Sequence, residues 1–167
     1  MNLSAILGLF VVLIANGGAL AQDLPIRPDD RLTPGVVAST DANDVCGIVD
    51  GLSYSRRNRH TSVELKHEIY AEYGINPEGR SFEVDHRVPL CIGGADVREN
   101  LWPQEGWQHP NFHDKDRLEE EVCRMVCRDH SMTLQTGQAI FLGDWIAGYR
   151  QVFGDDLSTG TDNTPKQ

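Results

Sequence analysis

The sequence predicts a small α+β domain that is stabilised by disulfide bonds. Two short strand patterns lie near the middle of the chain, about three helical patterns surround them, and the four cysteines form an even number. With 167 residues, the chain is long enough for one domain with its own hydrophobic core.

The segment Met1–Ala21 predicts a secretory signal peptide. It contains no charged side chain, is mostly apolar, and ends in a small-x-small cleavage pattern before Gln22. No Lys or Arg marks its start, and the apolar run approaches the length of a membrane span, so a retained anchor is the alternative. Gly and Asn residues within the run favour cleavage. We therefore expect a secreted or periplasmic protein with no stable membrane association after cleavage.

Residues 22–44 predict an extended N-terminal arm, because they are rich in Pro, Asp, Ala and Thr and show no periodicity. We expect this arm to be ordered only where Cys46 fixes its end. The main domain is expected over residues 45–153, and the polar tail over residues 154–167 is expected to be disordered.

The first helix is predicted over residues 62–73. Thr61-Ser62-Val63-Glu64 has the capping-box pattern at its start, and Gly74 follows as a C-terminal stop. The apolar residues of its buried face are spaced four apart: Leu65, Ile69 and Tyr73.

A β-hairpin is predicted from the two short strands. Phe82-Glu83-Val84 forms the first strand and runs directly into Asp85-His86. The Gly-rich residues 92–96 predict a loop. Leu101-Trp102 forms the returning strand, which we expect Pro103 to end.

Two further helices are predicted after the hairpin, over residues 111–128 and 134–152. The earlier one has a buried stripe of Leu118, Val122, Met125 and Val126, while Glu119, Glu120 and Arg124 can face water. The later one has Thr133 as its N-cap. Its apolar face comprises Leu142, Trp145, Ile146 and Tyr149.

The four cysteines predict two disulfide bonds, since an even count behind an export signal is typical of oxidised proteins. Cys123 and Cys127 lie four residues apart on one predicted helix, where a mutual bond would be strained, so each pairs elsewhere. The predicted pairs are Cys46–Cys127 and Cys91–Cys123. A Cys/His zinc site is the alternative, which the lack of a Cys-x-x-Cys knuckle disfavours.

The net charge of −10 is unfavourable for a nucleic-acid-binding protein, because an acidic surface repels phosphates. The charge is unevenly distributed, however. Arg56, Arg57 and Arg59 form a basic cluster before the first helix, and they can provide a local basic face for a polyanion. A solvated turn is the alternative explanation of this cluster.

Asp85 and His86 are adjacent on a predicted strand and therefore point to opposite faces. A carboxylate is a hard oxygen ligand for a cation, and a neutral imidazole takes a proton from water near neutral pH. A second ligand is expected from the start of the following helix. His113 is the first candidate, His109 the second and the side-chain carbonyl of Asn111 the third.

Asn100 is predicted to fix the loop between the strands, because an Asn side chain can donate and accept hydrogen bonds at once. A role as an oxygen ligand is the alternative.

These residues and their spacing resemble the HNH (His-Asn-His) endonucleases, whose site is the ββα-metal motif. The closer likeness is to secreted bacterial HNH-domain proteins that read DH-x-x-PL-x-x-GG, NLWP and H-x-KD-x-x-E. The corresponding segments here are Asp85-His86-Arg87-Val88-Pro89-Leu90 with Gly93-Gly94, Asn100-Leu101-Trp102-Pro103, and His113-Asp114-Lys115-Asp116-Arg117-Leu118-Glu119. The likeness covers residues 45–150 approximately, and three motifs in order are far more specific than one.

The resemblance implies a ββα-metal core with flanking helices and a largely sequence-nonspecific endonuclease that hydrolyses phosphodiester bonds. His86 would be the general base, Asn100 the loop-fixing residue of the catalytic motif, and Asp85 and His113 the metal ligands. Arg87 and Lys115 would add positive charge beside the phosphate. The donor set suits Mg²⁺ or Mn²⁺, and Zn²⁺ or Ni²⁺ could also bind. DNA is favoured over RNA as the substrate.

A second class of function remains open at this stage. A secreted module that keeps the HNH fold, binds a partner and lacks catalysis would suit the acidic charge. The oligomeric state is not readable from the sequence.

Overall fold

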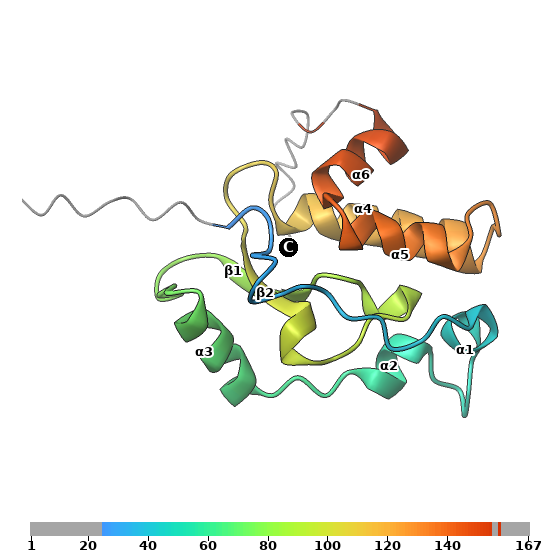
Figure 1. Ribbon diagram of the computed structural model, residues 1–167, viewed down its shortest axis with the longest axis horizontal. Coiled ribbons are helices and arrows are strands. Elements are labelled where there is room, and N and C mark those ends of the chain that lie inside the picture. Colours follow the sequence, from blue (N-terminus) through green and yellow to red (C-terminus); the bar gives the residue numbers. More distant parts are fainter. Residues whose placement is uncertain (1–24, 155–156, 158–167) are drawn as a thin grey trace, which may run out of the picture.

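The computed structural model describes residues 25–154 and residue 157, and its architecture is α+β, as predicted. The predicted signal peptide and most of the predicted tail lie outside these residues. The elements follow in this order: α1 (Ala42–Cys46), α2 (Tyr54–Asn58), α3 (Val63–Glu72), β1 (Phe82–His86), the short 3₁₀ turns η1 (Leu90–Ile92) and η2 (Arg98–Asn100), β2 (Leu101–Glu105), α4 (Phe112–Cys127), α5 (Leu134–Leu142) and α6 (Trp145–Phe153). Figure 1 shows α4, α5 and α6 gathered on one side of the hairpin and α3 on the other.

The hairpin is antiparallel, with Asp85 opposite Trp102 and His86 opposite Leu101. The returning strand continues through Pro103 to Glu105, so the prediction that Pro103 ends it is wrong. Within the described residues the sheet has only these two strands, and each is therefore an edge strand. A proline is tolerated on an edge strand because one side of the backbone makes no ladder hydrogen bond.

Helix α3 covers one face of the hairpin and lies within the predicted range. Ile69 packs with Val84 of β1 and Leu101 of β2 in a small apolar cluster. The N-cap is Ser62, whose hydroxyl accepts from the N–H of Leu65 at 3.1 Å, so the capping box predicted at Thr61 is wrong by one residue.

The main core lies between α4, α5 and α6. Its largest buried members include Leu118, Val122, Phe141, Trp145 and Tyr149. The predicted stripe of α4 is buried at Leu118, Val122 and Val126, whereas Met125 is only half-buried.

The helix predicted over residues 134–152 is two helices, which break at Gly143-Asp144. The side chain of Asp144 accepts from the N–H of Ile146 at 3.1 Å and so caps α6. It also forms a two-point ion pair with Arg27, at 2.9 and 3.0 Å. Gly143 ends α5 as its C-cap and Asp144 starts α6 as its N-cap, so the local residues break the helix. Leu142 is left 39% exposed at the break instead of lying on the apolar face.

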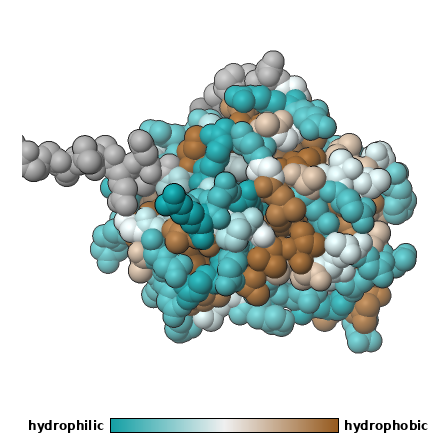
Figure 2. Space-filling view, in the orientation of Figure 1, coloured by the Kyte–Doolittle hydropathy of each residue, from teal (hydrophilic) through white to brown (hydrophobic). Residues whose placement is uncertain are grey.

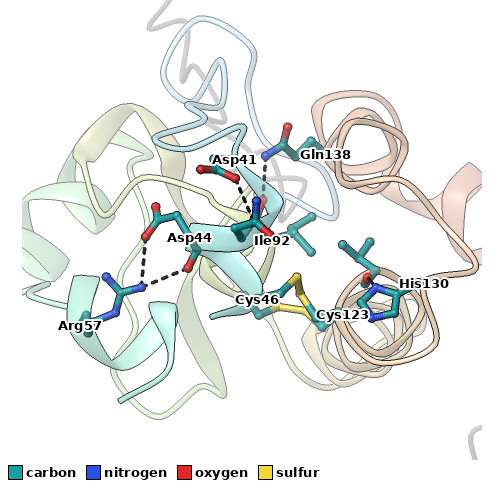
Figure 3. The surroundings of a disulfide bond; sticks show 12 residues. Asp41, Asp44, Cys46, Arg57, Ile92, Cys123, His130 and Gln138 are labelled. Atoms are coloured by element: carbon teal, nitrogen blue, oxygen red, sulfur yellow. Dashed lines mark hydrogen bonds and ion pairs between the residues drawn. A yellow bond between two sulfur atoms is a disulfide. The ribbon is translucent and has the colours of Figure 1, made fainter. Parts of the chain in front are cut away.

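Both predicted disulfides are present, and both reach α4. Cys46–Cys127 joins it to α1, and Cys91–Cys123 joins it to η1 in the loop between the strands. Figure 3 shows the surroundings of a disulfide, with Gln138 of α5 pointing toward the carbonyl of Ile92, to which it donates at 2.8 Å. No cysteine of the described chain is free, which excludes the zinc alternative for these thiols. Two disulfides indicate an oxidising environment outside the cytoplasm.

The described part of the N-terminal arm is ordered well before Cys46, contrary to the prediction. Thr33 is fully buried and donates through its hydroxyl to the carbonyl of Leu101 at 2.9 Å. Ala38 donates to the carbonyl of Gly93 at 2.8 Å, and α1 begins inside the predicted arm. The arm is thus laid across the loop that carries the candidate site.

The surface facing the viewer in Figure 2 is mostly hydrophilic, with an apolar area near its centre. Within the described residues, no helix combines the length and the apolar character needed to cross a membrane.

Candidate functional site

Two adjacent residues at the end of β1, Asp85 and His86, form the centre of the candidate site. The alternation of the strand directs them to opposite faces of the hairpin. Both are nearly buried, with 9% of Asp85 and 3% of His86 exposed. Each has its own charged partner, and the two partners come from different elements.

The partner of His86 is Asp96, in the loop between the strands. The imidazole Nε2 and a carboxylate oxygen of Asp96 lie 2.7 Å apart. Burial lowers the pKa of His86, the contact with Asp96 opposes this, and the positive charge of Arg59 adds to the lowering. The net effect is an imidazole that is neutral near pH 7, which a general base requires.

The carboxylate of Asp96 is fixed by two further donors. The N–H of His60 and the hydroxyl of Thr61 both donate to it from the segment that precedes α3. Burial acts to raise the pKa of Asp96, but the contacts with Thr61, His60 and His86 outweigh it and lower the pKa. Asp96 was not predicted. It is the only carboxylate between Arg87 and Arg98, which is the one sequence signal that could have identified it.

Asn100 is completely buried and makes four hydrogen bonds to backbone groups. Its amide nitrogen donates to the carbonyls of Val88 at 2.9 Å and Ala95 at 2.8 Å. Its oxygen accepts from the N–H groups of Val88 at 2.9 Å and Val36 at 3.2 Å. The side chain thereby ties both ends of the loop and the N-terminal arm together.

The partner of Asp85 is Lys115 of α4, which is only 1% exposed. Its ammonium donates to the carboxylate of Asp85 at 2.5 Å, to the carbonyl of His86 at 2.7 Å, and to the carboxylate of Glu119. Burial acts to lower the pKa of Lys115, but the two carboxylates outweigh it and raise the pKa. Burial and the negative charge of Asp85 raise the pKa of Glu119, against the opposing effect of Lys115.

This arrangement corrects the sequence-based role of Lys115. With three acceptors and almost no exposure, it cannot reach a phosphate on the surface. Arg87 is likewise 7% exposed and donates to Asp30, to the carbonyl of Thr33 and to the carbonyl of Leu142. Both side chains hold the fold together, because each connects segments that are distant in sequence.

The basic cluster is divided by the fold. Arg57 turns inward, where it donates to the carboxylate and the carbonyl of Asp44 at 3.2 and 3.1 Å, as Figure 3 shows. Arg56 and Arg59 are exposed. Of the predicted substrate-binding residues, these two have side chains at the surface.

The three candidates for the second metal ligand differ in the contacts that their side chains already make. Helix α4 begins at Phe112, two residues after Pro110, with Asn111 as its N-cap. The oxygen of Asn111 accepts from the N–H of His113 at 2.9 Å, so capping occupies it. Nδ1 of His109 lies 2.8 Å from the carboxylate of Asp114. His113 is exposed, and its ring packs beside Phe112 with the ring centroids 4.2 Å apart.

The donor set can be tested against a divalent cation. In the part of the chain that the structure describes, no three His, Cys, Asp or Glu residues are placed to share an ion. One carboxylate and one exposed imidazole fit Mg²⁺ or Mn²⁺, since such ions keep several waters when they bind to proteins.

Comparisons with models of protein families, with curated proteins and with solved structures gave no match. The functional conclusion therefore rests on the residues and contacts described above.

Proposed function

We propose that the protein is a metal-dependent endonuclease of the HNH kind that hydrolyses phosphodiester bonds of nucleic acid with little sequence specificity. One observation carries the proposal. A buried imidazole with a lowered pKa, His86, directly follows Asp85 in the chain, at the end of a hairpin whose loop is fixed by Asn100. A neutral base beside a hard oxygen ligand is the minimum that metal-assisted hydrolysis of a phosphodiester needs.

In this mechanism His86 takes the proton of the attacking water. Asp85 and His113 would hold the divalent cation, Mg²⁺ or Mn²⁺, which would supply positive charge to the phosphate. Asn100 keeps the loop in place, so that the base and the ligand stay in register. Arg59 and Arg56 offer exposed positive charge to the phosphate backbone.

The proposed substrate is DNA, and the proposed location is outside the cell or in the periplasm. Contacts with phosphates carry no sequence information, which is why little base specificity is expected. The two disulfides support the location, because they persist in oxidising compartments.

The experiment is a plasmid-nicking assay with the oxidised protein and Mg²⁺ or Mn²⁺, with and without a chelator, run in parallel on RNA. We expect metal-dependent nicking that His86→Ala abolishes. His67→Ala, which replaces an exposed histidine of α3, is the matched control and should retain full activity. Absence of nicking with every metal would refute the proposal.

A catalytically inactive binding module is the second candidate, and the burial of His86 favours it. A base that is 3% exposed admits little solvent, and the Lys115 ammonium already neutralises Asp85. Nucleic-acid binding without cleavage in the same assay would support this candidate instead.

A further inference from the structure

We propose that Asp96 is the positioning residue of His86: it holds the imidazole in the tautomer with its proton on Nε2 and so leaves Nδ1 as the basic nitrogen. The catalytic part of this inference rests on the proposed function. The tautomer itself rests only on the contact between the two side chains.

The direction of the hydrogen bond follows from the chemistry of the pair. A carboxylate can only accept, so the nitrogen that faces it must carry the proton. That nitrogen is Nε2, 2.7 Å from the carboxylate oxygen of Asp96. A neutral imidazole has one proton, and Nδ1 therefore keeps its lone pair. No described residue makes a hydrogen bond to Nδ1, so the protein does not occupy its lone pair.

The contact is built into the fold and is not a surface ion pair. Both side chains are 4% exposed. Asp96 is held from two further directions by His60 and Thr61, which belong to the segment leading into α3. The carboxylate thus has one fixed position, and the imidazole must adapt to it.

The other carboxylate nearby cannot serve this purpose. Asp85 is adjacent to His86 in sequence, but it points to the opposite face of the strand and is engaged by Lys115 at 2.5 Å. The two carboxylates therefore have separate tasks, with Asp85 as the ligand and Asp96 as the support of the base.

The oxygen of the attacking water forms a bond to phosphorus while one of its protons moves to Nδ1 of His86. The bond between phosphorus and the leaving alcohol oxygen breaks, and that oxygen takes a proton from solvent. The proton on Nε2 stays in its hydrogen bond with Asp96 throughout, which stabilises the imidazolium as it forms.

The test combines a structural and a kinetic measurement on the full disulfide-bonded protein. The ¹⁵N and ¹H signals of the His86 ring at neutral pH should show the proton on Nε2 in the wild type. Asp96→Asn should lose this single tautomer and should lower kcat for nicking by about 10²–10⁴-fold, with a smaller change in KM. Asp96→Glu should restore part of kcat. Asp144→Asn, a carboxylate-to-amide change at the remote N-cap of α6, should alter neither measurement.

The outcomes separate this inference from the proposed function. A wild-type ring protonated on Nδ1, or Asp96→Asn with wild-type kcat, would overturn the inference. A chain that does not nick but shows the Nε2 tautomer, lost in Asp96→Asn, would overturn the nuclease and support the positioning contact. The wild-type spectrum decides the tautomer even if Asp96→Asn does not fold.

Discussion

The two faces of the β1–β2 hairpin bury ionisable side chains with different partners. On the α3 face, His86 lies beside Val84 and Leu101 and meets a carboxylate that three donors fix. On the α4 face, one ammonium is shared between Asp85 and Glu119. The first arrangement keeps its base neutral, whereas the second keeps its cation charged. The proton acceptor, His86, and the residue that binds the Lys115 ammonium, Asp85, are therefore neighbours on one strand.

The difference shows why adjacent residues can have independent chemistry. The strand alternation directs the two side chains apart, and each face has its own electrostatic environment. A substitution on one face should therefore change the electrostatic contribution of that face to stability and leave the contribution of the other face unchanged.

The largest expected effect comes from breaking the α4 face. Lys115→Met should destabilise the protein by about 3–5 kcal/mol, because it leaves the buried carboxylate of Asp85 without its counter-charge. Urea unfolding of the oxidised protein measures this. Lys66→Met, an exposed lysine on α3, should change the free energy of unfolding by less than about 0.5 kcal/mol. A loss below about 1 kcal/mol for Lys115→Met would mean that the pair is not buried as described.

The second largest loss of stability is expected from a substitution in the loop between the two strands. Asn100→Ala removes four hydrogen bonds to buried backbone groups and should cost about 3 kcal/mol. Asn58→Ala removes one bond, to the carbonyl of Tyr54, and should cost about 1 kcal/mol. Similar losses for the two variants in urea unfolding would contradict the role of Asn100 as the centre of the loop.

The pH dependence of stability should differ between the faces. The pKa of Glu119 is raised in the folded state, so its contribution is fully present below its unfolded pKa and is lost as the pH rises through the folded pKa. Each pKa unit corresponds to about 1.4 kcal/mol. Glu119→Gln should flatten the decline in stability above about pH 5. An unchanged decline in unfolding experiments across this range would show that another group causes it.

The smallest effect on stability is expected on the α3 face, where the pKa shift of Asp96 has the opposite sign to that of Glu119. The pKa of Asp96 is lowered in the folded state, so its stabilisation is present above the ordinary aspartate range and is lost as the pH falls through the folded pKa. Asp96→Asn should reduce stability at neutral pH and reduce the further loss in acid. Acid titration of unfolding would refute this if the variant and the wild type lost stability in parallel below about pH 4.

The sequence predicted those features that depend on local periodicity. The alternation of β1, the stripe of α4 and the helical range of α3 follow from residue spacing alone. Excluding a bond within one helix leaves two possible cysteine pairings, and the structure has the predicted one. The break at Gly143-Asp144 has a local signal, a glycine at the C-cap followed by an aspartate at the N-cap, and was missed because the apolar periodicity continues across it. The resemblance gave Lys115 a role beside the phosphate, and only the tertiary contact with Asp85 shows that its side chain is buried. Asp96 has no periodic pattern at all.

The link between the start of the described chain and its last helix has a consequence for folding. Trp145 donates to the carbonyl of Ile26 at 3.0 Å, and Arg27 pairs with Asp144, so the first described residues of the arm gain these partners only once α6 has been synthesised. Contacts so distant in sequence form late, because their loop-closure entropy must be paid first. A chain truncated before residue 144 would therefore expose Ile26 and Arg27 to proteases, while Thr33 and Ala38 would still be held by the hairpin and its loop.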